Sequence, residues 1–303
     1  MIRLTDPYCG AMSKWSAADI AKQSGRTFVV TGANSGLGAV TATELARSGA
    51  HVVVACRDTA KGKQAAAAMP GDVEVRQLDL ADLTSVREFA AGLGEIAVLV
   101  NNAGVMATPK RQTKDGFELQ IGTNHLGHFA LTGLLLDRIT DRVVTMSSAA
   151  HRTGRIDLQD LNWEHRRYQR WPAYGQSKLA NLLFTYELQR RLTAAGSTRK
   201  AFAAHPGYAA TNLQSHTDSI QDRLMNVTNR IIAQSARMGA LPALYAATVP
   251  ELAGGSFIGP DGLFEQRGHP KIVKSSKASY DETTAAALWT LSQTLTGVTI
   301  DIA

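Results

Sequence analysis

Short apolar runs alternate with longer stretches of helical character along most of this chain. The runs are rich in valine and small apolar residues, and glycine, aspartate, asparagine or serine bounds each of them. Strands that are buried on both faces of a parallel sheet have this composition. We expect such strands at Thr27–Val30, His51–Cys56, Val73–Leu78, Ile96–Val100, Arg142–Met146 and Ala201–His205.

The stretches between these runs have the length and the residue propensities of helices. They cover Leu37–Ser48, Thr59–Ala68, Leu83–Gly92, Gly116–Ile139 and Ala173–Ala195, and a final helix is expected at about Glu282–Leu295. The repeated strand–helix–strand order implies right-handed crossovers. The predicted fold is therefore α/β, a single-domain Rossmann fold in which helices flank a doubly wound parallel sheet.

Three segments depart from this alternation. Residues 1–24 are expected to form an irregular N-terminal leader, so that the domain spans residues 25–303. Residues 149–172 and 207–235 are long connections, and such loops often bind ligands. We expect both to frame a substrate pocket. The candidate wall residues are Trp163, Tyr168, Trp171, Tyr208, Leu224, Met225 and Ile231. In the alternative, these side chains only pack the insertions onto the core.

Composition and charge narrow the class of protein. The chain of 303 residues has a net charge of +6, but its basic residues are scattered and lack interleaved aromatics, so we expect no nucleic-acid partner. No apolar stretch is long enough for a membrane span, and the N-terminus has no apolar core of a signal peptide. The two cysteines fit a reducing compartment. These features together predict a cytoplasmic protein.

A glycine-rich turn, TGANSGLG at residues 31–38, follows the first predicted strand. Its glycines let backbone N–H groups approach a diphosphate, toward which the next helix directs its positive end. The pattern differs from G-x-G-x-x-G, and a glycine turn can merely close a corner. Its position after a buried strand favours a dinucleotide site. The predicted contacts are Gly32, Asn34, Ser35, Gly36, Leu37 and Gly38.

The tip of the second predicted strand bears on the choice of cofactor. An acidic residue there binds the ribose hydroxyls of NAD, whereas a basic residue accommodates the 2′-phosphate of NADP. We expect Arg57 to bind this phosphate, helped by Ser35, because Asp58 lies one position later and can cap the next helix. In the alternative, Asp58 faces the ribose and Arg57 is a solvated charge. The predicted cofactor is NADP (NADPH).

Six segments in a fixed order carry a family resemblance. They are TGANSGLG at 31–38, NNAG at 101–104, NHLGHF at 124–129, MSSAAH at 146–151, YGQSK at 174–178 and HPGYAAT at 205–211. Their order and spacing resemble the short-chain dehydrogenase/reductase family across nearly the whole chain. The stretch DLNWEHRRYQRWPAYGQSKLANLLF is similar to the branch that contains retinol dehydrogenases and light-dependent protochlorophyllide reductases. The resemblance implies a nicotinamide-dependent oxidoreductase.

The candidate catalytic residues are Asn124, Ser148, Tyr174 and Lys178. Tyr174 and Lys178 are four residues apart, so one helix face presents both. A nearby ammonium favours the phenolate, which suits Tyr174 to act as general acid in reduction and general base in oxidation. Ser148, which the family pattern favours over Ser147, can bind the substrate oxygen, and the amide of Asn124 can hold a water. Each residue alone has an ordinary structural interpretation.

The resemblance implies further cofactor contacts. Besides Tyr174 and Lys178, with Lys178 holding the nicotinamide ribose, they are Asp79, Leu80, Asn101, Ala103, Gly104, Pro206, Gly207, Ala209 and Thr211. Asn102 is expected to tie adjacent strands together. We expect no metal, and we assign His125 and His128 to packing or polar contacts.

The predicted reaction is hydride transfer between the nicotinamide and a lipophilic carbonyl or alcohol. The alternatives are reduction of a double bond, as in protochlorophyllide reductases, and a dinucleotide sensor without turnover. Because the predicted helix Gly116–Ile139 is apolar over much of its circumference, we expect a homo-oligomer. Residues 259–276 are the alternative cover for that helix.

Overall fold

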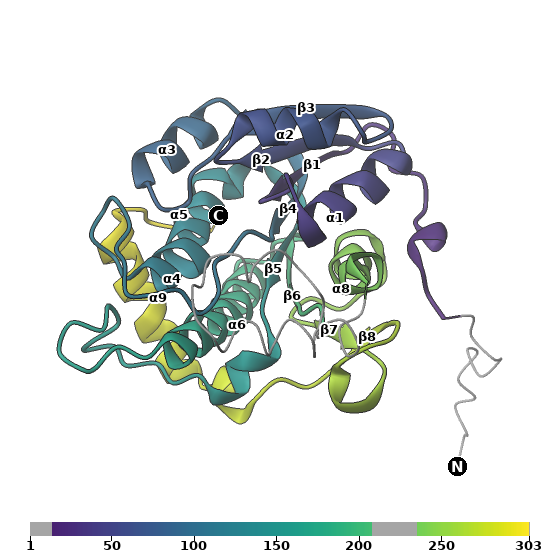
Figure 1. Cartoon of the computed structure of the whole chain (residues 1–303). Helices are drawn as coiled ribbons and strands as arrows, with labels where there is room; N and C mark the ends of the chain where they lie inside the picture. Colours follow the sequence, from purple (N-terminus) through teal and green to yellow (C-terminus); the bar gives the residue numbers. More distant parts are fainter. Residues whose placement is uncertain (1–13, 208–234, 303) are drawn as a thin grey trace, which may run out of the picture.

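The computed structural model describes residues 14–207 and 235–302. In this part of the chain, an eight-stranded sheet has the order β3-β2-β1-β4-β5-β6-β7-β8 (Figure 1). Strands β1 to β7 pair in parallel, and β8 pairs antiparallel with β7. The strands are β1 Thr27–Thr31, β2 His51–Cys56, β3 Asp72–Gln77, β4 Ile96–Asn101, β5 Ile139–Met146, β6 Lys200–Ala204, β7 Phe257–Pro260 and β8 Pro270–Ile272.

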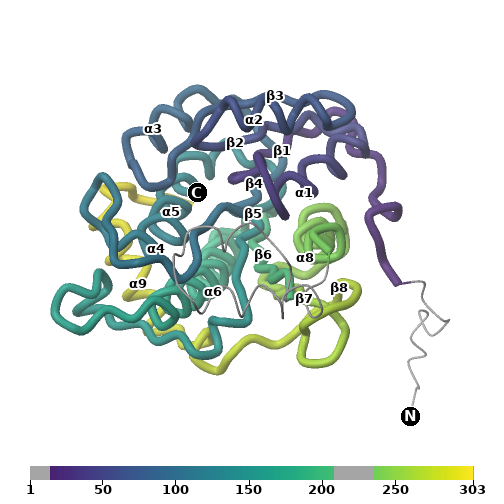
Figure 2. The backbone as a smooth tube through the Cα atoms, in the orientation of Figure 1, coloured from purple at the N-terminus to yellow at the C-terminus, as the bar shows by residue number. Residues whose placement is uncertain are grey.

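The doubly wound architecture predicted from the sequence is confirmed. Helices α1 (Gly36–Arg47), α2 (Thr59–Ala66) and α8 (Ala236–Thr248) cover one face of the sheet. Helices α3 (Leu83–Ala91), α5 (Gly127–Leu135) and α6 (Arg170–Ala194) cover the other, and α9 (Glu282–Thr296) packs outside α5 and α6 (Figure 2). In β1, Val29 faces one core while Phe28 and Val30 face the other, and all three are fully buried. Burial on both faces explains the unbroken apolar runs.

The single helix predicted at Gly116–Ile139 is wrong in detail. The segment forms one turn of α4 (Leu119–Ile121), a π-helical turn (Gly122–Leu126), α5 and a 3₁₀ turn (Leu136–Arg138). The π turn carries Asn124 and shifts the backbone hydrogen bonds by one residue there.

The apolar face of α5 is covered by this chain itself. Trp289 of α9 packs edge-on against Phe129 of α5, with ring centroids 5.3 Å apart. A Cβ on Gly133 would lie 2.7 Å from Ile300 and 2.8 Å from Val298, so the C-terminal segment lies directly on this helix. Residues 259–276 instead form β7, β8 and their flanks at the far edge of the sheet. The face that suggested a partner subunit is therefore already buried.

The remaining helical turns are Ala17–Asp19, Ala149–Thr153 (η4), Leu263–Glu265 and Lys277–Tyr280. Before the first strand, Trp15 packs edge-on against Tyr245 of α8, with ring centroids 5.1 Å apart. His269 Nδ1 also donates to the Trp15 carbonyl at 2.9 Å. The described part of the predicted leader thus rests on the domain.

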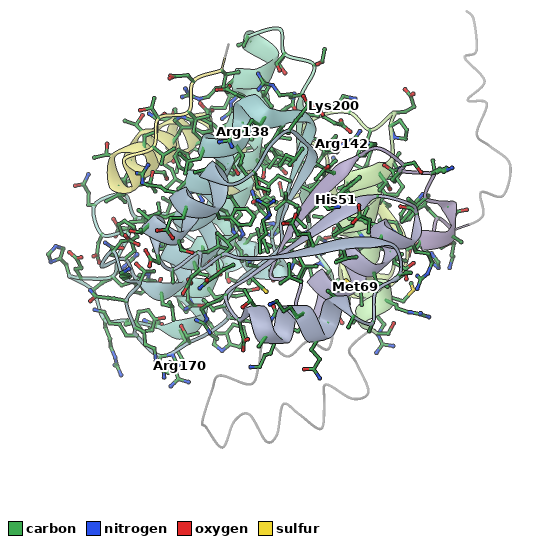
Figure 3. The ribbon with its side chains drawn as sticks, turned by 90° about the horizontal axis from the view of Figure 1, so that it is seen from above. His51, Met69, Arg138, Arg142, Arg170 and Lys200 are labelled. Carbon is green, nitrogen blue, oxygen red and sulfur yellow. The ribbon has the colours of Figure 1, made fainter. Side chains whose placement is uncertain are left out.

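Arg142, labelled in Figure 3, ties α8 to the amino end of β5. It is buried, and its guanidinium donates to the carbonyls of Ala246 and Val249, at 3.1 and 2.8 Å, where α8 ends. A helix C-terminus favours a cation, which offsets the burial of this charge. Among the described helices, none combines the length and apolarity needed to cross a membrane.

Candidate active site

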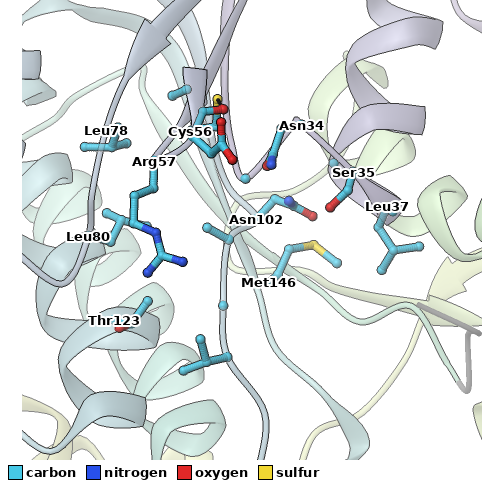
Figure 4. A pocket seen from close by; sticks show the side chains of 18 of the residues that line it. Asn34, Ser35, Leu37, Cys56, Arg57, Leu78, Leu80, Asn102, Thr123 and Met146 are labelled. Atoms are coloured by element: carbon cyan, nitrogen blue, oxygen red, sulfur yellow. Dashed lines mark hydrogen bonds between the residues drawn. The ribbon is translucent and has the colours of Figure 1, made fainter. Parts of the chain in front are cut away.

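A cavity of about 800 Å³ lies where β1 to β5 end (Figure 4). The strand order reverses between β1 and β4 at this point, and ligands of open α/β sheets bind at such switch points. The glycine turn, the tips of β2 and β3, the segment after β4 and part of α6 line the cavity.

All six residues predicted for the glycine turn line this cavity. Gly32 and Gly36 have φ angles of +66° and +56°, which favour glycine. A Cβ on Gly38 would lie 2.6 Å from the Gly32 carbonyl oxygen and 2.5 Å from Asn102 Nδ2. Ser35 precedes α1, and its side chain makes no capping hydrogen bond to the helix. The turn and the open N-terminus of α1 together fit a dinucleotide diphosphate.

At the tip of β2, Arg57 is exposed and extends into the cavity (Figure 4). Asp58 caps α2 by accepting a hydrogen bond from Lys61 N at 3.0 Å, which confirms its predicted capping role. Lys61 also lines the cavity, although the sequence reasoning did not single it out. Lys61 lies on the first turn of α2, four residues after Arg57, and this spacing could have identified it as a cavity residue.

Asp79 and Leu80 line the cavity, as do Ala103 and Gly104. Asn101 does not line it, because its side chain is fully buried and donates to Thr132 Oγ1 at 3.0 Å. The next residue, Asn102, both joins two strands and borders the cavity. Asn102 Nδ2 donates to the Thr31 carbonyl at 2.7 Å, tying β4 to β1 as predicted, and the residue also borders the cavity.

The amide of Asn124 is held by backbone and side-chain partners. Its oxygen accepts from Val105 N at 2.8 Å, and its nitrogen donates to Val105 O and Ser177 Oγ, both at 2.9 Å. Both amide hydrogens are thus engaged, and only an oxygen lone pair is left for the water that the sequence suggested. Asn124 joins the segment after β4 to α6, beneath Gly104, whose Cβ would lie 2.9 Å from its oxygen.

Tyr174 and Lys178 lie together at the inner wall of the cavity. They are 7% and 5% exposed, and Lys178 Nζ lies 5.7 Å from the centroid of the Tyr174 ring. Lys178 Nζ donates to the Met146 carbonyl at 3.2 Å. Burial lowers the pKa of Lys178 to about 8 and raises the pKa of Tyr174 to about 12, the latter partly offset by Ser148. Burial therefore outweighs the predicted lowering of the phenol pKa by Lys178.

The two neighbouring serines have different environments. Ser147 Oγ is buried and donates to the Lys178 carbonyl at 2.8 Å. Ser148 begins η4, and its hydroxyl accepts only a long hydrogen bond, at 3.3 Å, from Ala150 N while lying beside Tyr174. Ser147 lines the cavity, but its hydroxyl is held by the Lys178 carbonyl. Ser148 does not line the cavity, yet its hydroxyl lies within hydrogen-bonding reach of Tyr174.

Two predicted wall residues pack the 149–172 insertion onto the core. Trp163 is 5% exposed, with its ring 5.8 Å from that of Tyr168 and the Arg166 guanidinium 3.8 Å above it. Tyr168 donates its hydroxyl hydrogen to the buried carboxylate of Glu118 at 3.0 Å. Neither lines the cavity, so the packing alternative holds for both.

Trp171 does not line the cavity either, but its side chain is 50% exposed and its ring lies 6.2 Å from that of Tyr174. Pro206 lines the cavity, and Gly207 has a φ of +65° beneath the Gln266 carbonyl. The other predicted residues of this side lie outside the described residues. They are Tyr208, Ala209, Thr211, Leu224, Met225 and Ile231.

The two histidines beside Asn124 make polar contacts, as predicted. His128 Nδ1 donates to the Asn124 carbonyl at 3.0 Å, and His125 Nε2 lies 3.0 Å from Ser292 Oγ. Burial lowers the pKa of His125 to about 4 and that of His128 to about 3, so both are neutral at physiological pH.

Comparison with known proteins agrees with this arrangement. A family model described as short chain dehydrogenase matches residues 26–222. Human retinol dehydrogenase 13 is 43% identical over 291 residues, covering 90% of this chain and 85% of the relative. A crystal structure of an uncharacterised protein from Mycobacterium paratuberculosis is 57% identical, with a TM-score of 0.85, covering 96% of this chain and 100% of the other.

A structure from Beutenbergia cavernae, described as an NAD(P)-dependent gluconate 5-dehydrogenase with bound NADP, is 27% identical with a TM-score of 0.57. The match covers 74% of this chain and 90% of the Beutenbergia cavernae chain. The family match spans both the glycine turn and the Tyr174–Lys178 pair, which the fold brings to one cavity. The chain belongs to the short-chain dehydrogenase/reductase family, with retinol dehydrogenases among its relatives.

Proposed function

We propose that this protein is an NADP-dependent oxidoreductase that transfers a hydride between the nicotinamide and a lipophilic carbonyl or alcohol. The observation that carries the proposal is the cavity that joins Tyr174 and Lys178 to the glycine turn and Arg57. A dinucleotide needs a phosphate cradle at one end of its site and a proton-transfer group at the other. This single cavity offers both.

The preference for NADP rests on the charges at the tip of β2. Arg57 and Lys61 both line the cavity there, and the only carboxylate at the tip, Asp58, is used as the cap of α2. A guanidinium forms charge-assisted hydrogen bonds with a phosphate monoester. In this arrangement Arg57 binds the 2′-phosphate of NADP and Lys61 adds a second positive charge.

The bound nicotinamide supplies the hydride in reduction and accepts it in oxidation. Tyr174 donates its hydroxyl proton to the carbonyl oxygen, so that one hydride and one proton complete the alcohol. The raised pKa of Tyr174 keeps this proton in place before reaction. Ser148 donates a hydrogen bond to the same oxygen, and Lys178 holds the nicotinamide ribose. In oxidation, the positive charge of Lys178 stabilises the phenolate that accepts the alcohol proton.

The class of substrate is proposed from the relatives and from Trp171. The relatives include retinol dehydrogenases, and the half-exposed Trp171 ring flanks Tyr174. An indole in this position forms an apolar wall beside the reacting oxygen. We therefore expect aldehydes with extended apolar chains, such as retinaldehyde, to be reduced faster than small polar ones.

Binding and turnover test this proposal separately. Nicotinamide fluorescence is followed while the purified protein is titrated with NADPH and, in parallel, with NADH. NADPH oxidation is then measured with retinaldehyde, decanal, benzaldehyde and acetaldehyde, and Tyr174→Phe is the matched control. The proposal expects tighter binding of NADPH and turnover that Tyr174→Phe abolishes. Tighter binding of NADH would reverse the choice of cofactor, and binding without turnover of any aldehyde would favour a dinucleotide sensor.

A further inference from the structure

The loop between β7 and β8 has a strained backbone and lies against the turn that ends β6. Phe264 and Glu265 have φ angles of 51° and 57°, in the left-handed region that non-glycine residues rarely adopt. Phe264 is 81% exposed and Leu263 80% exposed, so the loop leaves two large apolar side chains in solvent. Strain that persists without local burial must be balanced by contacts elsewhere. Glu265 makes those contacts.

The Glu265 carboxylate lies beside two partners, Arg152 and His205. Oε2 lies 3.2 Å from Nε2 of His205, and it accepts a hydrogen bond from Arg152 Nη2 at 3.1 Å. His205 Nδ1 accepts a hydrogen bond from Gly207 N at 3.3 Å, which places the ring proton on Nε2, facing the carboxylate. The pKa of Glu265 is lowered mainly by His205, so the carboxylate is charged at neutral pH.

The first partner leads to the turn that ends β6. His205 is 1% exposed and immediately precedes Pro206, which lines the cavity. A Cβ on Gly207 would lie 2.4 Å from the Gln266 carbonyl oxygen, so the β7–β8 loop lies directly on this turn. Gly259 of β7 leaves room for the imidazole, because a Cβ there would lie 2.1 Å from His205 Nε2.

The second partner leads to Ser148. Arg152 belongs to η4, the 3₁₀ turn that Ser148 begins, and it also donates to the Lys274 carbonyl at 3.1 Å. In the same turn, His151 Nδ1 donates to the Ser148 carbonyl at 2.6 Å, while its Nε2 accepts from Ser276 N at 3.0 Å. The segment after β8 thus braces the turn that carries the Ser148 hydroxyl.

The same hairpin contacts both turns through an aromatic ring. Phe257 of β7 lies 5.6 Å from the ring of His151 and 5.0 Å from the ring of His205. The turn of Pro206 and the turn of Ser148 are therefore connected twice, through the carboxylate of Glu265 and through the apolar ring of Phe257. Neither residue lines the cavity.

We propose that Glu265 is a positioning residue, which fixes the Ser148 turn and the Pro206–Gly207 turn relative to one another through Arg152 and His205. The inference rests on the proposed function in so far as the two turns flank the reacting carbonyl. Misplacement of a reacting group by about 1 Å can lower the rate about a hundredfold. Loss of Glu265 is therefore expected to lower turnover while leaving the phosphate cradle of the cofactor intact.

Amide hydrogen exchange tests the coupling without any substrate. Glu265→Gln and Glu265→Ala are compared with wild type and with Glu251→Gln, a control at an exposed carboxylate in the connection after α8. Exchange should rise in peptides that cover 146–153 and 200–207, stay unchanged in β1 and β2, and stay unchanged throughout in the control. Faster exchange confined to residues 257–272 would overturn the proposal.

Kinetics with retinaldehyde and NADPH test the consequence. Both Glu265 variants should lose about tenfold or more in kcat, with the Kd for NADPH changed less than twofold, and Arg152→Ala should add little to Glu265→Ala. A wild-type kcat in Glu265→Ala, or fully additive losses, would contradict the inference. If wild type itself reduces no aldehyde, the proposed function fails, and hydrogen exchange still decides the role of Glu265.

Discussion

Lys178 lies 5.7 Å from the centroid of the Tyr174 ring, and its ammonium donates to the Met146 carbonyl. Among the described residues this nearly buried ammonium has no carboxylate partner, which is costly, and burial lowers its pKa from 10.5 to about 8. Burial of the charged lysine lowers the free energy of unfolding at neutral pH by about 3 kcal/mol. Such a residue suits a functional role better than a stabilising one.

Lys178→Met is therefore expected to raise the free energy of unfolding at pH 7 by about 2 to 3 kcal/mol while it abolishes turnover. The Met146 carbonyl keeps a partner, because Asn181 Nδ2 also donates to it at 3.0 Å. Denaturant unfolding of both proteins measures the difference.

The pH dependence of this difference has a defined sign. Between pH 8 and 10.5 the unfolded chain holds the Lys178 proton and the folded one does not, so wild-type stability rises with pH there. The advantage of Lys178→Met should be full below pH 8 and vanish above pH 10.5. An advantage that persists at high pH would show that burial of the charge is not its cause.

Most of the sheet was predictable because a strand buried on both faces admits little but small and branched apolar residues. The π turn at Asn124 was not, because it depends on an amide that bridges Val105 and Ser177, residues distant in sequence. The sequence also did not predict β7 and β8, which are short and contain Gly259, Pro260 and Pro270. Strand β7 pairs with β6 and β8 pairs with β7, so both form through tertiary contacts rather than through a local pattern.

In the candidate site, too, features set by local sequence could be predicted and features set by tertiary packing could not. The glycine turn and the Tyr174–Lys178 pair could be predicted because their spacing is local. The roles of Trp163 and Trp171 could not, because both belong to one polar insertion and only tertiary packing separates them. Trp163 is covered by Tyr168 and Arg166, whereas Trp171 stays half exposed beside Tyr174.

The two tryptophans should therefore respond in opposite ways to truncation. Trp163→Ala is expected to lower the free energy of unfolding by about 3 to 5 kcal/mol, since it leaves a buried cavity. Trp171→Ala should cost less than about 1 kcal/mol but raise the KM for retinaldehyde about tenfold. Thermal unfolding and steady-state kinetics on the pair check this, and equal effects on KM would remove Trp171 from the substrate wall.

Arg57→Ala tests the choice of cofactor. Loss of charge-assisted hydrogen bonds to the 2′-phosphate should weaken NADPH binding about 10- to 100-fold and leave NADH binding within about twofold. Lys61→Ala is the companion variant, with a smaller expected effect because its ammonium already lies 3.5 Å from Asp58. Parallel fluorescence titrations measure both. An equal loss for the two cofactors would place Arg57 outside the 2′-phosphate site.

Isotope transfer shows whether a hydride passes from the nicotinamide to the substrate in the cavity at Tyr174. Retinaldehyde is incubated with NADPH deuterated at the nicotinamide C4 position, in each stereochemical form, and the alcohol is examined by mass spectrometry. With wild type, one of the two forms should give an alcohol with one deuterium at the carbinol carbon, and Tyr174→Phe should give no product. Unlabelled alcohol from both forms, or labelled alcohol formed equally well by Tyr174→Phe, would contradict the proposed mechanism.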